Sequence, residues 1–194
     1  EGASGFNVRG GNADQNLIIL DEAPVYNSSH LFGFFSIFNA DAVKDVKLFK
    51  GGMPANYGGR LSSVLDIRQK EGNSKKFSAN GGIGLLSSRL TLEGPIVKDK
   101  VNFMLAGRRS YFDLFFPLFD VPELNESIAY FYDFNAKLNA KVSKKDKIYL
   151  SAYFGRDQFS ASELFKFGWG NWTSTLRWNR VISPKWFFNA SAVY

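Results

Sequence analysis

The sequence has no cysteine and a single histidine, and these two shortages limit the kinds of site it can build. Without cysteine there is no disulfide framework and no cysteine-based zinc or iron–sulfur site. A serine–histidine–aspartate triad would have to use His30, yet no serine in the chain lies in a nucleophile elbow. One histidine also makes a poor protein zinc site. We therefore expect no catalytic residue, no metal site and no cofactor.

Long apolar segments are absent as well. No stretch approaches the roughly 18 to 20 apolar residues of a transmembrane helix. Residues 1–5 lack the basic start and apolar core of a signal peptide. These observations do not exclude membrane-spanning β-strands, because each such strand has a much weaker sequence signal than a transmembrane helix. The net charge of +6 arises from scattered lysines and arginines, which is typical of a solvated surface of mixed sign.

Aromatic residues, at 16% of the chain, and 18 glycines are what the sequence has in quantity. This combination favours strands and tight turns over helices. Up to about Gly72 the chain shows short strands joined by loops. Residues 17–20 form a continuous apolar run, and 45–50 and 63–67 predict two more strands. Asn39 is placed to cap a short helix. This part is predicted to be a small mixed α/β unit.

From residue 77 onward the pattern changes to long alternating strands, most clearly over residues 128–143. One face of that strand is apolar or aromatic: Tyr130, Tyr132, Phe134, Ala136, Leu138, Ala140 and Val142. The other face is polar: Asp133, Asn135, Lys137, Asn139 and Lys141. A stripe of this length with a period of two indicates a strand rather than a helix.

Further strands are predicted at 77–93, 101–112, 147–159, 171–182 and 185–194, making about six in all. Short connections (94–100, 143–146 and 183–184) alternate with long ones (113–127 and 160–170). Such alternation is typical of an outer-membrane meander, whose strands need about 9 to 11 residues to cross the bilayer. The alternative is a soluble β-sandwich with the aromatic faces as its core. The polar faces favour a wet lumen over that sandwich.

The glycine-rich stretch LFKGGMPANYGGRLSSVLDIRQK (48–70) could be a phosphate cradle or a β-turn. A phosphate loop requires a helix after its glycines, whereas residues 64–68 alternate like a strand. Gly10 and Gly11 precede a strand rather than follow it, which does not suit a dinucleotide fold. An RNA-binding sheet needs aromatic and basic residues on one face, and here they lie on opposite faces. We expect no nucleic-acid partner.

Four ordered blocks resemble the plug domain of TonB-dependent outer-membrane receptors. They are FNVRGG (6–11), QNLIILDEAPV (15–25), ADAVKDVKLFKGGMPANY (40–57) and SVLDI (63–67). The phrases SIFN (36–39) and YGGRLSS (57–63) look most like the receptors of Bacteroidetes.

The resemblance implies a mainly β fold with two parts. Residues 1–72 are expected to be a mixed α/β plug domain whose N-terminal portion is missing. Residues 73–194 are expected to be the first strands, about six, of an antiparallel transmembrane β-barrel of about 22 strands. In such a receptor the glycines of the 48–70 stretch serve a tight turn between plug strands, and no phosphate is implied.

The resemblance also implies the function. A receptor in the Gram-negative outer membrane binds a scarce extracellular nutrient (an iron chelate, cobalamin, a glycan or a peptide) and imports it by energy-coupled remodelling of the plug. Its partners would be the TonB–ExbB–ExbD motor, through a TonB box outside this segment, outer-membrane lipid, the nutrient and a surface lipoprotein. Two alternatives stay open. One is a plug–barrel protein for binding, signalling or secretion, and the other is an enzyme on a soluble sandwich.

Three sets of site residues follow from the resemblance. The cations expected to lock the plug to the barrel are Arg9, Lys50 (where an arginine is usual) and Arg60. The expected ligand contacts are Asn27, Ser28, Ser29 and His30. Glycines expected to permit positive φ and close approach to the barrel wall are Gly10, Gly11, Gly51, Gly52, Gly58 and Gly59.

Overall fold

The computed structural model describes residues 6–118, 127–161 and 165–194, which form two units. The N-terminal unit (residues 6–72) contains η1 (Ala13–Gln15), β1 (Asn16–Leu20), β2 (Ala23–Pro24), β3 (Ser29–His30), η2 (Leu31–Gly33), β4 (Phe35–Ser36), β5 (Val43–Phe49) and β6 (Ser63–Gln69). The wall, as we call the second unit, contains β7 (Ser78–Ile83), β8 (Ser87–Val97), β9 (Val101–Ser110), η3 (Phe112–Leu118), β10 (Ile128–Lys141), β11 (Asp146–Ala161), β12 (Phe165–Ser183) and β13 (Trp186–Val193). The η elements are 3₁₀ helices.

A four-stranded sheet in the order β2–β1–β6–β5 is the centre of the N-terminal unit. Strands β1 and β6 are parallel, whereas β2 and β5 pair antiparallel to them. The apolar run predicted at 17–20 is the central strand β1. Its side chains Ile18 and Leu20 pack with Ile37 and Ile67 in one buried cluster, which is the core of this unit.

The helix predicted to begin at Asn39 is wrong, because the chain makes only one turn there. The Asn39 side chain accepts a hydrogen bond from the backbone N–H of Asp41 (3.0 Å), and its carbonyl accepts from those of Ala42 and Val43. Val43 then enters β5. Asn39 therefore caps a local turn, a role that asparagine fills as readily as the start of a helix.

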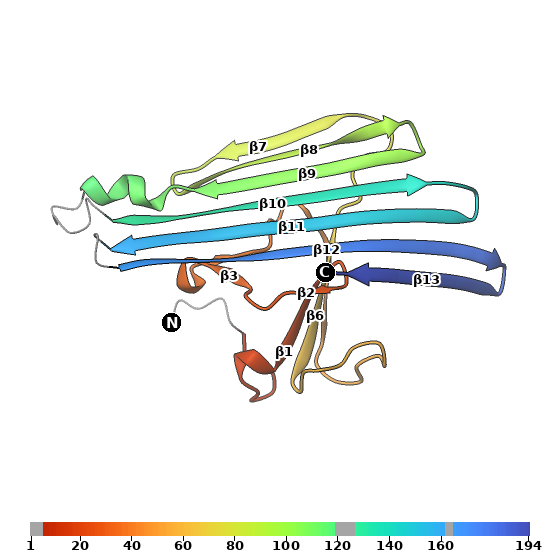
Figure 1. Ribbon diagram of the computed structural model, residues 1–194, viewed down its shortest axis with the longest axis horizontal. Helices are drawn as coiled ribbons and strands as arrows, with labels where there is room; N and C mark the ends of the chain where they lie inside the picture. Colours follow the sequence, from red (N-terminus) through yellow and green to blue (C-terminus); the bar gives the residue numbers. More distant parts are fainter. Residues whose placement is uncertain (1–5, 119–126, 162–164) are drawn as a thin grey trace.

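The wall is a meander of seven antiparallel strands, each paired with its neighbours in the chain (Figure 1). The single strand predicted over 77–93 is wrong: the chain folds there into the β7–β8 hairpin, closed by the hydrogen bond from Gly84 N to Ser87 O. The long loop predicted over 160–170 is also wrong, because β12 begins at Phe165. Gly168 and Gly170 lie inside this strand, each facing a close neighbouring backbone.

The two faces of β10 are used as the alternation predicts. Its polar side chains Asp133, Asn135, Lys137 and Asn139 are all buried against the N-terminal unit. Phe134, on the opposite face, is 46% exposed. The sandwich alternative required the aromatic stripe to be the buried face, so the observed packing is against it. In the described ranges, no helix has the length and apolar character needed to cross a membrane.

Gly72 lies in the link between the two units and requires the absence of a side chain. Its φ is +83°, and a Cβ there would overlap the backbone carbonyl of Phe103 in β9. The left-handed conformation alone costs a residue with a Cβ about 1–2 kcal/mol. The glycine that approaches the wall closely is therefore Gly72, which was not among the six predicted from sequence.

We expect Gly72→Ala to destabilise the full-length protein by more than that backbone cost, because the carbonyl of Phe103 cannot move without disturbing its strand pairing. The check is the midpoint of thermal unfolding in detergent. Gly58→Ala is the matched control, since a Cβ at Gly58 meets nothing within 4 Å. Equal midpoints for the two variants would contradict this account.

Candidate functional site

The candidate site is the interface between the N-terminal unit and the wall. Apolar contacts cross it at three places. Ile37 packs in a cluster with Tyr153 of β11, and Leu31 packs with Phe131 of β10. Ala42 packs with Met104 and Ala106 of β9. Between these clusters the interface is made of charged and polar side chains, which is unusual for a buried surface.

His30 is the centre of the first polar group. It lies at the end of β3, is 1% exposed, and is 2.7 Å through Nδ1 from Asp157 Oδ2. Its Nε2 lies 3.4 Å from Asp133 Oδ2 and 3.3 Å from the Tyr153 hydroxyl. Asp157 also accepts a hydrogen bond from the backbone N–H of Leu31 (2.7 Å). One imidazole thus joins the N-terminal unit to both β10 and β11.

Arg108 of β9 completes this group. Its Nε and Nη2 donate to Asp133 Oδ2 at 2.8 and 2.6 Å, and Nη2 also donates to the Ser36 carbonyl of the N-terminal unit. Burial alone lowers the pKa of His30, but the hydrogen bonds and negative charges of Asp133 and Asp157 outweigh it. The net effect raises the pKa of His30 above its ordinary value of 6.5.

A second polar group joins Asp21 to Lys137. The Lys137 Nζ donates to both carboxylate oxygens of Asp21 (3.0 and 2.9 Å) and to the Gln69 carbonyl (3.1 Å). Both charged side chains are less than a tenth exposed. All three ammonium hydrogens can therefore be used, which is what a buried lysine needs in order to stay charged.

Glu22, next to Asp21, also reaches the wall. It pairs with Arg177 of β12 (3.0 Å) and accepts a hydrogen bond from Ser191 of β13. Asp21 and Glu22 form the two-residue turn between β1 and β2, with φ values of 47° and 75°. Both residues of such a turn need positive φ, which costs a side-chain-bearing residue energy. Here that turn directs two carboxylates to two cations on the wall.

The three cations predicted to lock the plug lie elsewhere. Arg9 is exposed and its guanidinium lies over Gly51, while Lys50 is exposed at the end of β5. Arg60 is exposed and donates only a long hydrogen bond (3.4 Å) to the neighbouring Gly59 carbonyl. Within the described residues, no ion pair joins any of the three to the wall, so their role stays a prediction. The observed pairs instead join Asp21 and Glu22 of the N-terminal unit to cations of the wall, and His30 to two carboxylates of the wall.

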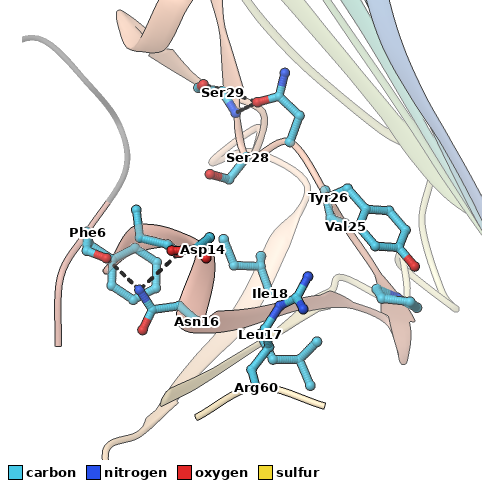
Figure 2. Close-up of a pocket in the computed structure, with 13 residues that line it drawn as sticks. Phe6, Asp14, Asn16, Leu17, Ile18, Val25, Tyr26, Ser28, Ser29 and Arg60 are labelled. Atoms are coloured by element: carbon cyan, nitrogen blue, oxygen red, sulfur yellow. Dashed lines mark hydrogen bonds between the residues drawn. The ribbon is translucent and has the colours of Figure 1, made fainter. Parts of the chain in front are cut away.

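The residues predicted to bind ligand divide into two groups. Asn27, Ser28 and Ser29 line a cavity of about 310 Å³, with Arg60 among its other lining residues (Figure 2). Asn27 accepts hydrogen bonds from Ser29, and its carbonyl accepts one from Asn171 of the wall (2.8 Å). His30 does not line this cavity, because both of its ring nitrogens face the wall instead.

Of the six glycines predicted to serve turns, three have positive φ: Gly10, Gly52 and Gly59. The place of a Cβ is taken by Ser62 at Gly11 and by Arg9 at Gly51, whereas Gly58 has open space. These contacts lie inside the N-terminal unit. No group of three or more histidine, aspartate or glutamate side chains in the described parts of the chain is arranged to hold a metal ion.

Sequence reasoning missed most of this interface. Asp21 and Glu22 directly follow the predicted strand at 17–20, and nothing in their local sequence marks them as wall contacts. A signal for the wall side was present in the polar stripe of β10, which contains Asp133 and Lys137. Since the stripe is buried, its charges require partners of opposite sign, and acids at turns of the first unit were the available ones.

We expect Lys137→Met to weaken the attachment of the N-terminal unit to the wall by roughly 3–5 kcal/mol, because it leaves the buried Asp21 carboxylate without a cation. The measurement is the urea concentration that detaches this unit in the full-length protein. Arg89→Met is the control. Its ion pair with Asp41 also joins the wall to the N-terminal unit (3.1 Å), but the Arg89 side chain is about half exposed, so the loss should stay below about 1 kcal/mol. Equal losses would show that burial does not set the strength of these pairs.

Comparison with known proteins agrees with this arrangement. Residues 1–64 match the family model described as TonB-dependent Receptor Plug Domain. The siderophore receptor PirA from Acinetobacter baumannii has a similar structure, with a TM-score of 0.66 at 13% identity over 95% of this chain. A variant of the ferric enterobactin receptor PfeA from Pseudomonas aeruginosa gives 0.57 at 14% identity over 88%. No curated protein matches the sequence.

The chain spans 32% of the length of the first receptor and 31% of the second. At these identities the likeness concerns the fold. The family match concerns the N-terminal unit, which contains every acid of the interface described above except Asp133 and Asp157. Residues 1–64 are therefore similar to the plug domain of TonB-dependent receptors, and the antiparallel strands that follow have the fold of such receptors, so we call the N-terminal unit the plug from here on.

Proposed function

We propose that this chain is part of an outer-membrane receptor that binds a scarce extracellular nutrient and imports it by energy-coupled remodelling of the plug. In this proposal residues 1–72 form the plug domain, and 73–194 form strands of a larger transmembrane β-barrel. The observation that carries the proposal is the buried charged interface. A plug held by ion pairs and hydrogen bonds leaves polar surfaces on both sides when it moves, so water can replace the lost contacts.

The outer face of the wall supports a membrane location. Phe134, Phe154 and Trp172 are cross-strand neighbours on β10, β11 and β12, and Leu150 pairs with Leu176 beside them. These five side chains are between 39% and 65% exposed, on the face opposite the plug. A contiguous apolar surface on a sheet whose other face is polar is the pattern of a membrane strand.

A group of aromatic rings supports ligand binding on the plug side of the wall. The Phe32 ring of η2 lies 5.2 Å from that of Phe159, 6.5 Å from Phe167 and 5.1 Å from Trp169. Phe32 is 55% exposed and has a φ of 57°. Exposed rings held by a strained backbone are a common feature of binding sites. The cavity lined by Asn27, Ser28 and Ser29 is a second candidate contact region.

The two similar receptors bear the names of siderophore and ferric enterobactin receptors, which makes a ferric chelate the first nutrient class to test. Cobalamin, glycans and peptides follow. The energy source in this proposal is the TonB–ExbB–ExbD motor, acting through a TonB box outside this segment. The proposal includes a surface lipoprotein as a further partner. It also includes a receptor of the Bacteroidetes type, which the resemblance of residues 36–39 and 57–63 supports.

The decisive experiment is uptake by a strain that lacks the gene, supplied with the full-length protein and a panel of labelled iron chelates, cobalamin and glycans. We expect one nutrient to accumulate only when the motor is intact. Binding to cells without motor-dependent accumulation would instead indicate a binding or signalling role.

On the nutrient identified in this way, we expect Phe32→Ala to weaken binding about three- to tenfold, the worth of one aromatic contact. Phe34→Ala is the matched control, because Phe34 is two residues away and 75% exposed. Binding constants measured on the purified receptor provide the check. If both variants bind like the parent, the aromatic group is not part of the binding site.

A further inference from the structure

The position of His30 is unusual for the single histidine of a chain. The imidazole belongs to the plug, yet its hydrogen-bonding partners Asp157, Asp133 and Tyr153 all belong to the wall. Its ring stacks on Phe131 at 4.2 Å, with only 6° between the planes. Gly155 keeps the space open, since a Cβ there would lie 3.1 Å from His30 Cε1. The wall therefore forms a fitted socket for this ring.

Among the residues that the structure describes, the charges around the ring balance only when His30 is protonated. Arg108 on β9 and Asp133 on β10 face it, and β11 contributes Asp157 and the Tyr153 hydroxyl. From the described part of the plug, residues 6–72, this group receives neutral backbone groups, the Leu31 N–H and the Ser36 carbonyl. With His30 charged, two cations face two carboxylates. With His30 neutral, a net negative charge stays buried among side chains that are at most 14% exposed.

Neutral His30 could keep two of its contacts. Nδ1–H could still donate to Asp157, and the Tyr153 hydroxyl could donate to Nε2. Asp133 would then lose its second cation, and a ring lone pair would face its carboxylate at 3.4 Å. Deprotonation therefore weakens the contact without abolishing its geometry.

We propose that His30, Asp133 and Asp157 form a protonation-dependent latch between the plug and the wall, so that the plug is held firmly while His30 is charged and released more readily once it is neutral. The latch depends on the docked arrangement of the two units. Its test relies on the transmembrane barrel of the function proposed above, but neither the latch nor the test uses the nutrient or the motor.

The direction of the pH effect follows from linkage. The pKa of His30 is raised in the docked state, whereas a plug that has left its socket exposes the ring to water, where the pKa is near 6.5. Below that value both states hold the proton and docking is strongest. Between the two pKa values undocking releases a proton, so the docking constant falls by up to about tenfold per pH unit. Above the raised pKa the contribution of the latch is lost.

The test is urea-induced opening of the full-length receptor in planar bilayers, recorded as conductance between pH 6.0 and 9.5. We expect the urea concentration that opens the wild-type pore to fall as the pH rises. His30→Gln keeps a hydrogen-bonding side chain without the titration, so it should open at lower urea at pH 6.0 and lose the slope. Ile37→Val, at a fully buried core position of the plug, should lower the midpoint at every pH and keep the slope.

Equal slopes for wild type and His30→Gln would overturn the proposal. If His30→Gln fails to assemble, the histidine ring nitrogen shifts of the wild-type protein decide the matter. These shifts should titrate with a pKa above the ordinary value of 6.5, and a pKa at or below that value would equally overturn the latch. In Asp157→Asn, the fall of the opening urea concentration with pH should occur at lower pH than in the wild type. The substitution removes one of the two carboxylates that keep the proton on His30.

Discussion

The need to neutralise charges that are removed from water governs how the two units of this protein fit together. Lys137 and Arg108 point from the wall into a buried surface, and each requires a carboxylate. Asp133 is supplied by the wall itself, and Asp21 comes from a turn of the plug. Removing one partner costs several kcal/mol, so the register between plug and wall is specified more sharply than apolar packing alone could specify it.

The same need to neutralise buried charges explains why polar and apolar side chains alternate along each strand. The side chains of β10 alternate between a polar row that faces the plug and an apolar row on the opposite face. The polar row continues on β11 and β12 with the buried side chains of Ser151, Asp157, Thr173 and Thr175. The inner row is buried by the plug with polar partners, so no dry core is needed there. One sheet can therefore satisfy two surroundings of opposite polarity at once.

The sequence was most informative where a pattern is local. The period of two in residues 128–143 predicts both the strand and the use of its faces, and the apolar run at 17–20 predicts the central strand of the plug. Predictions that depend on context were wrong: β12 begins inside the loop predicted over 160–170, and Asn39 caps a turn rather than a helix. The contact of His30 with Asp157 joins residues 127 positions apart, and no local rule brings them together. The predicted lock cations Arg9, Lys50 and Arg60 came from resemblance alone. A resemblance of this kind identifies equivalent sequence positions, but it does not identify the residues that they contact.

The link after β6 has a mechanical consequence. It runs from the end of β6 at Gln69 to the start of β7 at Ser78, and Asn102 donates hydrogen bonds to the carbonyls of Glu71 and Gly72. A plug that undocks from the wall thus remains tethered to it by this short link. Its return is a unimolecular step at an effective concentration in the millimolar range or above, which is set by the length of the linker. Reseating should therefore be fast and independent of the concentration of the protein.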